Sequence, residues 1–368
     1  MIAIGAIFFV FALILLGVLA LGYYPKAEQD EPVTQLIDAP LLSRQPAFKV
    51  LSYNVQFMAG KDYTFWFDVP EANGPDSQPS AEAVQKTIAD VANIIIDEDA
   101  DFVFLQEVDD GAKRTGKKDQ LNALLALLPA TYAYHTSAFY WKSGFVPHPR
   151  ILGRTGMKLS ILSKHPITSA KRHQLALTPD NVLVKHLGIK RAVLEARVPL
   201  QEGSELVLLN THLEAFSKNS DTLQKQVDHV RSMLQTLNDQ NLPWVIGGDF
   251  NLLPPNQYQT LPPREQFYYR PTSELEDLTR QFSSVPSIED VEKDPANWYS
   301  FYSNDPDVTQ PDRTLDYLFY SPLLTCQSKT VRQHDTINIS DHFPIIASFG
   351  LEAYTDQPTL ELGEKNVS

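Results

Sequence analysis

Several short apolar runs of the chain end abruptly in carboxylate, amide or imidazole side chains. Each run has the length and composition of a β-strand. A single Asn, Asp or Glu at a strand end is more often a turn former or a helix cap than a ligand, so the inference rests on the joint pattern. The expected strands cover 48–53, 102–106, 206–211, 244–248 and 315–320, and the polar residues that follow or lie within them are Asn54, Glu107, His212, Asp249, Asn251 and Asp316.

These residue types suit the hydrolysis of a phosphate ester. Negative charge grows on the equatorial and leaving oxygens of a phosphodiester during the reaction, and a hard cation and imidazolium donors stabilise it. Oxygen ligands without thiolates favour Mg²⁺, with Mn²⁺ as the second choice, over zinc. The single cysteine, Cys326, excludes an internal disulfide and a multi-cysteine metal site, and we expect it to be buried among apolar groups.

Helical patterns separate the expected strands. Ser80 can cap a helix in which Val84, Ile88, Val91 and Ile95 follow 4-3-4 spacing, and a second 4-3-4-3 pattern runs from Leu223 to Leu237. Strands that alternate with helices predict an α/β sandwich. Polar residues at strand ends, where loops converge, are the usual place for a site on such sheets.

The charge of the chain is unevenly distributed. The formal charge of the 368 residues is −14, which argues against a general nucleic-acid coat protein. The segment 142–197 alone has eleven basic and two acidic residues, so it carries +9 and the remainder −23. Such a segment is either a solvated basic face or a strip for an anionic substrate or membrane headgroup. Arg154 and Lys158, just before an expected strand over 159–163, are the candidates for phosphate contacts.

The chain begins with an uncharged apolar run from Ile2 to Gly22. About 20 such residues span a bilayer as a helix. A cleaved signal peptide is the alternative, because Ala20-Leu21-Gly22 fits a cleavage site. The run is longer than the apolar core of a typical signal peptide and no Lys or Arg precedes it, which favours an anchor. We expect the catalytic domain on the extracytoplasmic side, periplasmic or extracellular, and secreted if the segment is cleaved.

Four regions follow from these patterns. Residues 1–24 are the transmembrane anchor or signal segment, and residues 25–47, with four prolines, are a Pro-rich tether. Residues 48–351 show no break in composition and form one catalytic domain. Residues 352–368 are a polar tail.

Six motifs resemble, in order, those of the endonuclease/exonuclease/phosphatase superfamily, which includes deoxyribonuclease I, AP endonucleases, inositol polyphosphate 5-phosphatases, deadenylases and neutral sphingomyelinases. The resemblance covers about 48–351 and implies two packed mixed β-sheets flanked by helices. The motifs are Leu51-Ser52-Tyr53-Asn54, Leu105-Gln106-Glu107-Val108, Asn210-Thr211-His212-Leu213, Gly247-Gly248-Asp249-Phe250-Asn251, Leu315-Asp316-Tyr317 and Ser340-Asp341-His342-Phe343-Pro344.

The resemblance also implies a role for each residue. Glu107 would hold a divalent metal, assisted by Asn54 and Asp341. Asp249 and Asn251 would orient the attacking water and the phosphate. His342 would be the general base, steered by Asp316, and His212 would protonate the leaving group or bind the phosphate, although the two histidine roles could exchange. The other seven histidines are expected at the surface or in packing.

The substrate is the least determined part of the hypothesis. Two aromatic-rich stretches, Phe65-Trp66-Phe67 and Phe139-Tyr140-Trp141, either pack their loops down or form an apolar rim for lipid or stacked bases. Together with the expected anchor they favour a membrane-tethered phosphodiesterase acting on a lipid-like substrate, similar to a sphingomyelinase or phospholipase C. His212 departs from the AP endonuclease pattern, which disfavours abasic-site repair.

Two alternatives remain, an extracytoplasmic endo- or exonuclease and a catalytically silent binding protein on the same fold. No protein partner is inferred. The phosphoesterase hypothesis requires Asn54, Glu107, His212, Asp249, Asp316 and His342 to converge in one cleft.

Overall fold

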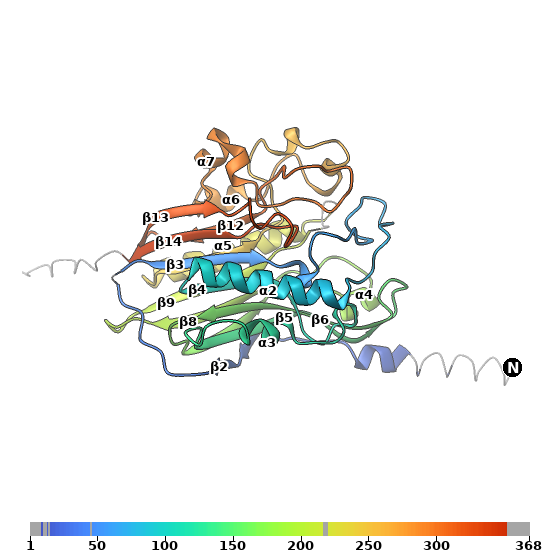
Figure 1. Ribbon diagram of the computed structural model, residues 1–368, viewed down its shortest axis with the longest axis horizontal. Coiled ribbons are helices and arrows are strands. Elements are labelled where there is room, and N and C mark those ends of the chain that lie inside the picture. The colour runs from blue at the N-terminus through green and yellow to red at the C-terminus, as the bar shows by residue number, and fades with distance from the viewer. Residues whose placement is uncertain (1–8, 10–12, 14, 45, 216–219, 352–368) are drawn as a thin grey trace, which may run out of the picture.

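Two seven-stranded β-sheets pack face to face in the computed structural model of the protein (Figure 1). It describes residues 9, 13, 15–44, 46–215 and 220–351. The strands of the first sheet, in spatial order, are β1 (Glu28–Glu31), β7 (Ser169–Gln174), β8 (Ala192–Pro199), β9 (Glu205–His212), β10 (Trp244–Asp249), β12 (Asp316–Tyr320) and β11 (Ser283–Val285). Those of the second sheet are β13 (Leu324–Val331), β14 (Ile345–Leu351), β3 (Phe48–Asn54), β4 (Phe102–Asp109), β6 (Gly153–Ser163), β5 (Tyr134–Val146) and β2 (Val33–Gln35).

Helices cover the outer faces of both sheets. The predicted α/β sandwich of two mixed sheets flanked by helices is therefore confirmed. The helices are α2 (Ala81–Glu98), α3 (Gln120–Leu125), α4 (Val182–Leu187), α5 (Thr222–Asp239), α6 (Glu276–Thr279) and α7 (Ile288–Lys293), and the single 3₁₀ turns are η1 (Gln56–Met58), η2 (Lys113–Thr115), η3 (Tyr258–Thr260), η4 (Glu265–Tyr268) and η5 (Pro295–Trp298).

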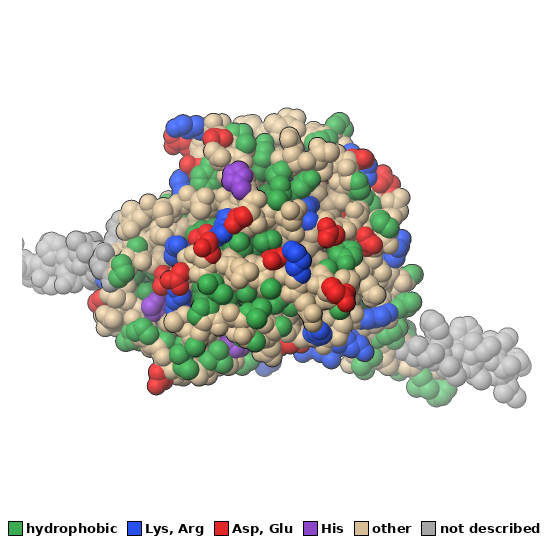
Figure 2. All heavy atoms as spheres, viewed as in Figure 1, with side chains coloured by type: hydrophobic (Ala, Val, Ile, Leu, Met, Phe, Trp, Pro, Cys, Tyr) green, Lys and Arg blue, Asp and Glu red, His purple; other side chains and the backbone are tan. Residues whose placement is uncertain are grey.

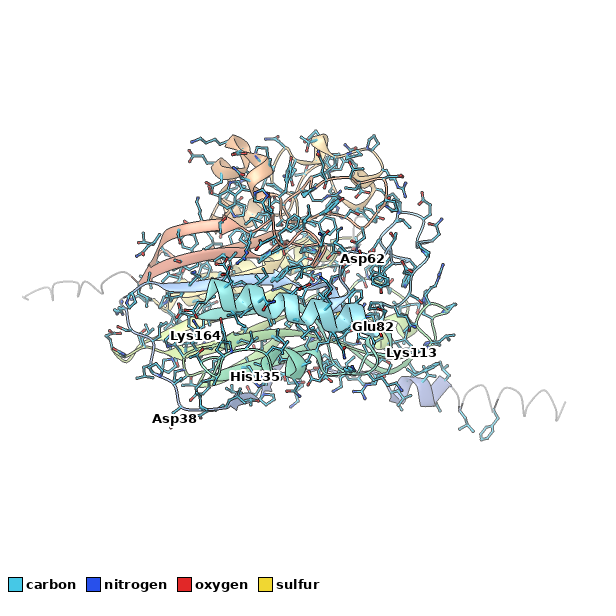
Figure 3. All side chains as sticks on the ribbon, in the orientation of Figure 1. Asp38, Asp62, Glu82, Lys113, His135 and Lys164 are labelled. Carbon is cyan, nitrogen blue, oxygen red and sulfur yellow. The ribbon has the colours of Figure 1, made fainter. Side chains whose placement is uncertain are left out.

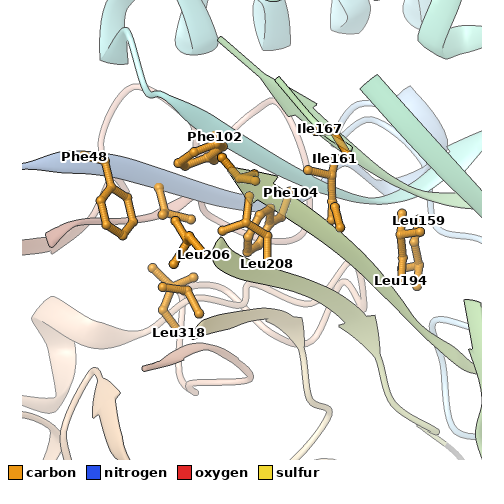
Figure 4. Packing of buried hydrophobic residues seen from close by; sticks show 14 of the residues in the cluster. Phe48, Phe102, Phe104, Leu159, Ile161, Ile167, Leu194, Leu206, Leu208 and Leu318 are labelled. Carbon is orange, nitrogen blue, oxygen red and sulfur yellow. The ribbon is translucent and has the colours of Figure 1, made fainter. Parts of the chain in front are cut away.

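The main core lies between the two sheets (Figure 4). Phe48, Phe102 and Phe104 of the second sheet face Leu208 and Leu318 of the first, and all five side chains are fully buried. Each such side chain contributes roughly 1.5–3 kcal/mol by leaving water. Cys326 packs against this core but keeps intermediate exposure, so its expected burial is only partial.

The two long helices form where the 3.6-residue spacing predicted them. The Ser80 hydroxyl caps α2 by accepting a hydrogen bond from the Ala83 N–H at 3.1 Å. The apolar face of α2 packs on the outside of the second sheet, and that of α5 packs on the outside of the first. In Figure 1, α2 crosses in front of the sheet that contains β3 and β4.

Parallel pairing brings the polar strand ends to one edge. β3 runs parallel to β4, which sets Asn54 opposite Gln106, and β9 runs parallel to β10, which sets His212 opposite Asp249. Because parallel strands point to the same edge of a sheet, β3, β9 and β10 bring their last residues, and β4 its Gln106, to one place.

A buried amide bridge joins the sheets beneath that edge. Gln106 Nε2 donates to Asn210 Oδ1 at 2.8 Å, and Asn210 Nδ2 donates to the carbonyls of Leu105 and Ser160 at 3.0 and 2.9 Å. Both amide side chains are fully buried. A buried polar group that lost its partner would cost about 1–3 kcal/mol, so this bridge fixes how the two sheets align.

The segment expected as a tether differs from a free linker. Glu28–Glu31 pairs with β7 at the edge of the first sheet, and Val33–Gln35 pairs with β5 at the edge of the second. Exposed strand edges offer unpaired N–H and C=O groups, and this alternating segment satisfies them on both sheets. The domain bounds themselves stay a prediction.

Most of the expected anchor lies outside the described residues. Residues 15–20 are helical, and within the part of the chain that is described no helix has the length and apolarity needed to cross a membrane. The expected tail, 352–368, lies wholly outside the described residues.

Gly248 offers a test of how tightly the edge of the sheet is constrained. Its φ is +146°, and a Cβ at this position would lie 1.9 Å from the Thr211 carbonyl oxygen on the neighbouring strand. We expect Gly248→Ala to lower the free energy of unfolding by about 3 kcal/mol or more, measured by urea denaturation.

Gly203 provides the matched control. Its φ is +86°, yet a Cβ there would contact nothing within 4 Å, so Gly203→Ala carries backbone strain alone and should cost only about 1 kcal/mol. Equal losses for the two variants would show that the contact with Thr211 is unimportant.

Candidate active site

The Asp249 carboxylate is the centre of a buried polar cluster. Its Oδ2 lies 3.1 Å from Asn54 Nδ2, 3.2 Å from His212 Nε2 and 3.4 Å from His342 Nε2. Its Oδ1 accepts a hydrogen bond from the Asn251 N–H at 2.9 Å. The predicted convergence of residues from distant parts of the chain is therefore present in the structure.

A carboxylate, an imidazole and a hydroxyl form one arm of the cluster. Asp316 Oδ2 lies 2.7 Å from His342 Nδ1 and accepts a hydrogen bond from the Ser300 hydroxyl at 2.7 Å. This contact fixes the ring orientation of His342 and leaves Nε2 directed at Asp249. Asp316 is thus placed to steer His342, as the motif comparison implied.

The two histidines have opposite electrostatic environments. Burial alone lowers the pKa of His342, but the charges of Asp316 and Asp249 outweigh it and raise this pKa to about 10. Burial and then the charge of Arg191 hold the pKa of His212 well below its usual value. His342 is therefore the cationic imidazole of the cluster and His212 the neutral one.

The roles of the histidines in the reaction remain predictions. Burial raises the pKa of Asp249 to about 7, against the lowering effect of the His342 charge. A proton shared between these groups is what a site for acid–base chemistry requires. A general base must be neutral when it takes a proton. The base role of His342 therefore requires that the negative charge of the carboxylates around it be reduced first.

Backbone strain accompanies the residues of the cluster. Glu107 has φ +61° at an irregularity in the pairing of β4 with β6, and Asn251 has φ +53°. Gln56, Phe57 and Met58, which begin two residues after Asn54, also have positive φ. Non-glycine residues rarely adopt this conformation, at a cost of about 1–3 kcal/mol each, and a bulge re-aims a side chain out of the regular alternation.

Glu107 and Asp341 are the pair best suited to a divalent cation. Burial and then the charge of Asp341 raise the pKa of Glu107, and burial raises that of Asp341. Buried carboxylates whose ionised forms are disfavoured in this way are stabilised by a bound cation. The donors are oxygens, which Mg²⁺ and Mn²⁺ prefer.

Asn54 presents its amide nitrogen to these groups. Nδ2 donates to Glu107 Oε1 at 3.3 Å as well as to Asp249, and Oδ1 accepts from the Gln56 N–H at 3.1 Å. In this arrangement Asn54 positions the carboxylates. Ligation of a metal by its oxygen would require the amide group to turn over.

A second group of potential ligands lies beside the first. Atoms of Asp249, Asp316 and His342 lie within 4.8 Å of one another and could hold a metal ion. His342 is already hydrogen-bonded to one of these carboxylates and cationic, and a protonated imidazole cannot ligate a metal. The Glu107 and Asp341 side of the cluster is therefore the better fit.

Arg154 and Lys158 are not brought into the cluster. Lys158 is only 6% exposed, and its ammonium lies 3.2 Å from Asp110 and 3.3 Å from Asp119, so its charge is already paired. Arg154 is exposed, with its guanidinium over Gly111. Their predicted contacts with phosphate remain untested.

Two arginines near the cluster were not singled out from the sequence. Arg114 donates two hydrogen bonds of 2.9 Å to Asp109 and lies close enough to Glu107 to lower its pKa. Arg191 lies close to Glu107 and His212. Arg191 was counted in the basic segment, but nothing in its sequence context distinguishes it from neighbours that face solvent.

Some side chains of the aromatic-rich stretches pack their loops down, and others remain partly exposed. Phe57 and Phe65 are buried against each other, with ring centroids 5.0 Å apart, which matches the packing interpretation. Trp66 remains half-buried and stacks on His148 at 4.9 Å. Tyr140 is fully buried, with its hydroxyl 3.4 Å from His212 Nδ1, so it belongs to the site and not to a rim.

The family model described as the Endonuclease/Exonuclease/phosphatase family matches residues 51–342. The chain belongs to this family. Its members hydrolyse phosphodiester bonds, and a cluster of Asp249, Asp316 and His342 is present here. The protein is therefore a hydrolase acting on phosphoric ester bonds. No curated protein sequence matches the chain.

Solved structures agree with this fold. An endonuclease/exonuclease/phosphatase from Beutenbergia cavernae is 21% identical with a TM-score of 0.55, covering 83% of this chain and 72% of that one. The human Nocturnin catalytic domain with bound sulfate is 17% identical with a TM-score of 0.52, covering 88% and 97%. A family member from Bacteroides vulgatus is 16% identical with a TM-score of 0.51, covering 84% and 100%.

The coupling of His342 to Asp316 can be measured by substitution. We expect His342→Ala to lower kcat by about 10²–10⁴-fold and Asp316→Asn to lower it less. Because the two side chains act as one unit, the double variant should be no slower than His342→Ala alone. Losses that multiply in the double variant, measured with a soluble chromogenic phosphodiester, would contradict the coupling.

Proposed function

We propose that this family member is a membrane-tethered, divalent-metal-dependent phosphodiesterase acting on a lipid-like phosphodiester. The observation that carries the proposal is the Asp249-centred cluster with oxygen donors on one side and imidazoles on the other. A cation held by Glu107 and Asp341, with Mg²⁺ preferred and Mn²⁺ second, would neutralise charge on the phosphoryl oxygens.

The side chains of the cluster carry out the proton transfer and orient the reactants. His342, once the negative charge around it is reduced and its ring is neutral, takes a proton from the attacking water at Nε2, while Asp316 holds the ring and Asp249 and Asn251 orient the water and the phosphate. A bond forms between the water oxygen and phosphorus, and the bond to the leaving oxygen breaks. His212, on the other side of Asp249, donates a hydrogen bond from its N–H to the leaving oxygen, which takes its proton from solvent.

The location of the N-terminal segment supports a membrane substrate. Gly22 pairs with Ser143, and the Gly144 N–H donates to the Leu21 carbonyl at 2.8 Å. Ser143 lies three residues along β5 from Tyr140, which contacts His212, and three strand residues span about 10 Å. The segment expected as an anchor therefore joins the domain close to the site.

Exposed apolar and basic side chains lie around this junction. Val182 and Val184 of α4 are 66% and 45% exposed, and α4 contacts β5. A pocket of about 310 Å³ at the junction is lined by Lys142 and Arg154, among others. Lys113, labelled in Figure 3, donates to the Ile151 and Leu152 carbonyls in the same region, and Figure 2 shows Lys and Arg side chains gathered beside the N-terminal segment. Such a mixture suits an anionic lipid surface, with Arg154 as a headgroup contact.

An extracytoplasmic nuclease is the second candidate function. The stack of Trp66 on His148 beside the basic segment offers a surface on which bases could stack. The charge of −23 on the remainder of the chain opposes a long nucleic-acid contact. A silent binding protein is disfavoured because such a protein has no need to bury a cluster of charged groups at this cost.

Metal dependence is the first test. We expect EDTA to abolish hydrolysis of a soluble phosphodiester and Mg²⁺ to restore it. Glu107→Gln should raise the Mg²⁺ concentration needed for half-maximal activity by at least about 10-fold, because it removes a ligand charge. Asp62→Asn, which removes an exposed carboxylate labelled in Figure 3, is the control and should change nothing. Activity that survives EDTA would overturn the metal role.

Substrate preference is the second test. We expect the full chain, reconstituted with Mg²⁺, to hydrolyse choline phospholipid or phosphoinositide vesicles faster than plasmid DNA. Trp66→Ala should reduce vesicle turnover and leave hydrolysis of a soluble diester unchanged, whereas Leu127→Ala, an exposed apolar residue just beyond α3, should affect neither. Cleavage of DNA without turnover of lipid would reverse the order of the two functions.

A further inference from the structure

Arg191 is a buried arginine without the acceptors that its charge requires. It precedes β8 and is 4% exposed, and neither its Nε nor its Nη1 has a hydrogen-bond partner among the described residues. Its nearest carboxylate oxygen in an ion pair, on Glu214, lies 3.8 Å from Nε, beyond hydrogen-bond distance. Burying a charge with so little compensation costs several kcal/mol.

Two arginines that are buried even more deeply show the usual arrangement. Arg172 donates to the Phe139 and Lys190 carbonyls and to Gln174 at 2.8–2.9 Å. Arg313 donates to Glu265 and Asp312 at 2.7–2.9 Å. Each of these two arginines thus has at least three hydrogen bonds to protein acceptors, although Arg172 Nη1 has no partner, whereas both Nε and Nη1 of Arg191 lack one.

The position of Arg191 explains why two of its nitrogens lack acceptors. Its guanidinium carbon lies 5.5 Å from the centroid of the Tyr140 ring, and the Tyr140 hydroxyl lies 3.4 Å from His212 Nδ1. Its charge acts on the pKa values of Glu107 and His212, whereas the charges that act on His342 are those of Asp316, Asp249 and Asp341. Arg191 therefore lies on the His212 side of Asp249, away from the His342 arm.

Arg114, the other arginine near Glu107, has a carboxylate partner within the protein. Its Nε and Nη2 both donate to Asp109, so its charge is compensated without a ligand. A phosphoryl group entering between Glu107 and His212 would meet the unused donors of Arg191. Guanidinium groups match the geometry of phosphate oxygens and form strong charge-assisted hydrogen bonds with them.

We propose that Arg191 is a binding residue for an anionic oxygen of the substrate's phosphoryl group, on the His212 side of the site. This deepens the proposed phosphodiesterase function and rests on it. The ligand class is a phosphate ester or, in its simplest form, inorganic phosphate. Nε and Nη1 of Arg191 have no hydrogen-bond partner in the fold because their acceptor arrives with the substrate.

The proposal predicts opposite effects on stability and on binding. Arg191→Met keeps most of the side-chain volume and removes an uncompensated buried charge, so the melting temperature of the free protein should rise or stay the same. Its kcat/KM for a soluble phosphodiester should fall about 10- to 100-fold, the loss of one hydrogen bond to a charged group. Inorganic phosphate should raise the melting temperature of the full-length Mg²⁺-loaded protein and fail to do so in Arg191→Met.

Control variants separate this role from a structural one. Arg172→Met removes a guanidinium with several acceptors and should lower the melting temperature. Arg231→Met removes an exposed charge on α5 and should leave stability, phosphate binding and activity unchanged. Arg191→Lys retains the charge and should recover part of the phosphate binding.

Two results would overturn the role of Arg191. One is phosphate binding in Arg191→Met as tight as in the parent protein. The other is a lower melting temperature in Arg191→Met with kcat/KM unchanged. Failure of the proposed function looks different, because the parent protein would then hydrolyse no phosphodiester while its phosphate binding still depended on Arg191.

Discussion

The strands of both sheets must end at the same edge, because one buried carboxylate contacts residues from both sheets. Asp249 is the last residue of β10 in the first sheet, and Asn54, the last residue of β3 in the second sheet, donates to it. His212 and His342 approach the same oxygen from β9 and from the loop before β14. A buried carboxylate needs several such donors to remain ionised, so a slip in either sheet would leave it uncompensated.

The Gln106–Asn210 bridge keeps that alignment. An apolar interface between sheets slides at little cost, because hydrophobic contact is non-directional. The amide bridge is directional and sits one residue before Glu107 on one strand and two before His212 on the other. The register of the two sheets is thereby coupled to the position of the Asp249-centred cluster, and Gly248 lets β9 and β10 approach each other closely at this edge.

The sequence allowed the strands, the long helices and the members of the cluster to be predicted, because period and residue type are local properties. Pairing partners are not local. The ammonium group of Lys158 is of a type that binds phosphate, but it is already paired with Asp110 and Asp119. Arg191 lies among ten other basic residues of its segment, and only its surroundings in the fold show that its Nε and Nη1 lack hydrogen-bond partners. The strand pairing of residues 28–35 could not be predicted either, because an acidic, Pro-containing segment has the composition of a linker. It forms strands only because two open sheet edges lie beside it.

That short segment has a practical consequence for any fragment of the protein. Pro32 alone separates a strand on one sheet from a strand on the other, so eight consecutive residues, 28–35, close two edges at once. A fragment that starts after Gln35 would leave β5 and β7 each with an unpaired backbone, which favours association between copies through strand addition. A soluble, monomeric form of the domain must therefore start at or before Glu28.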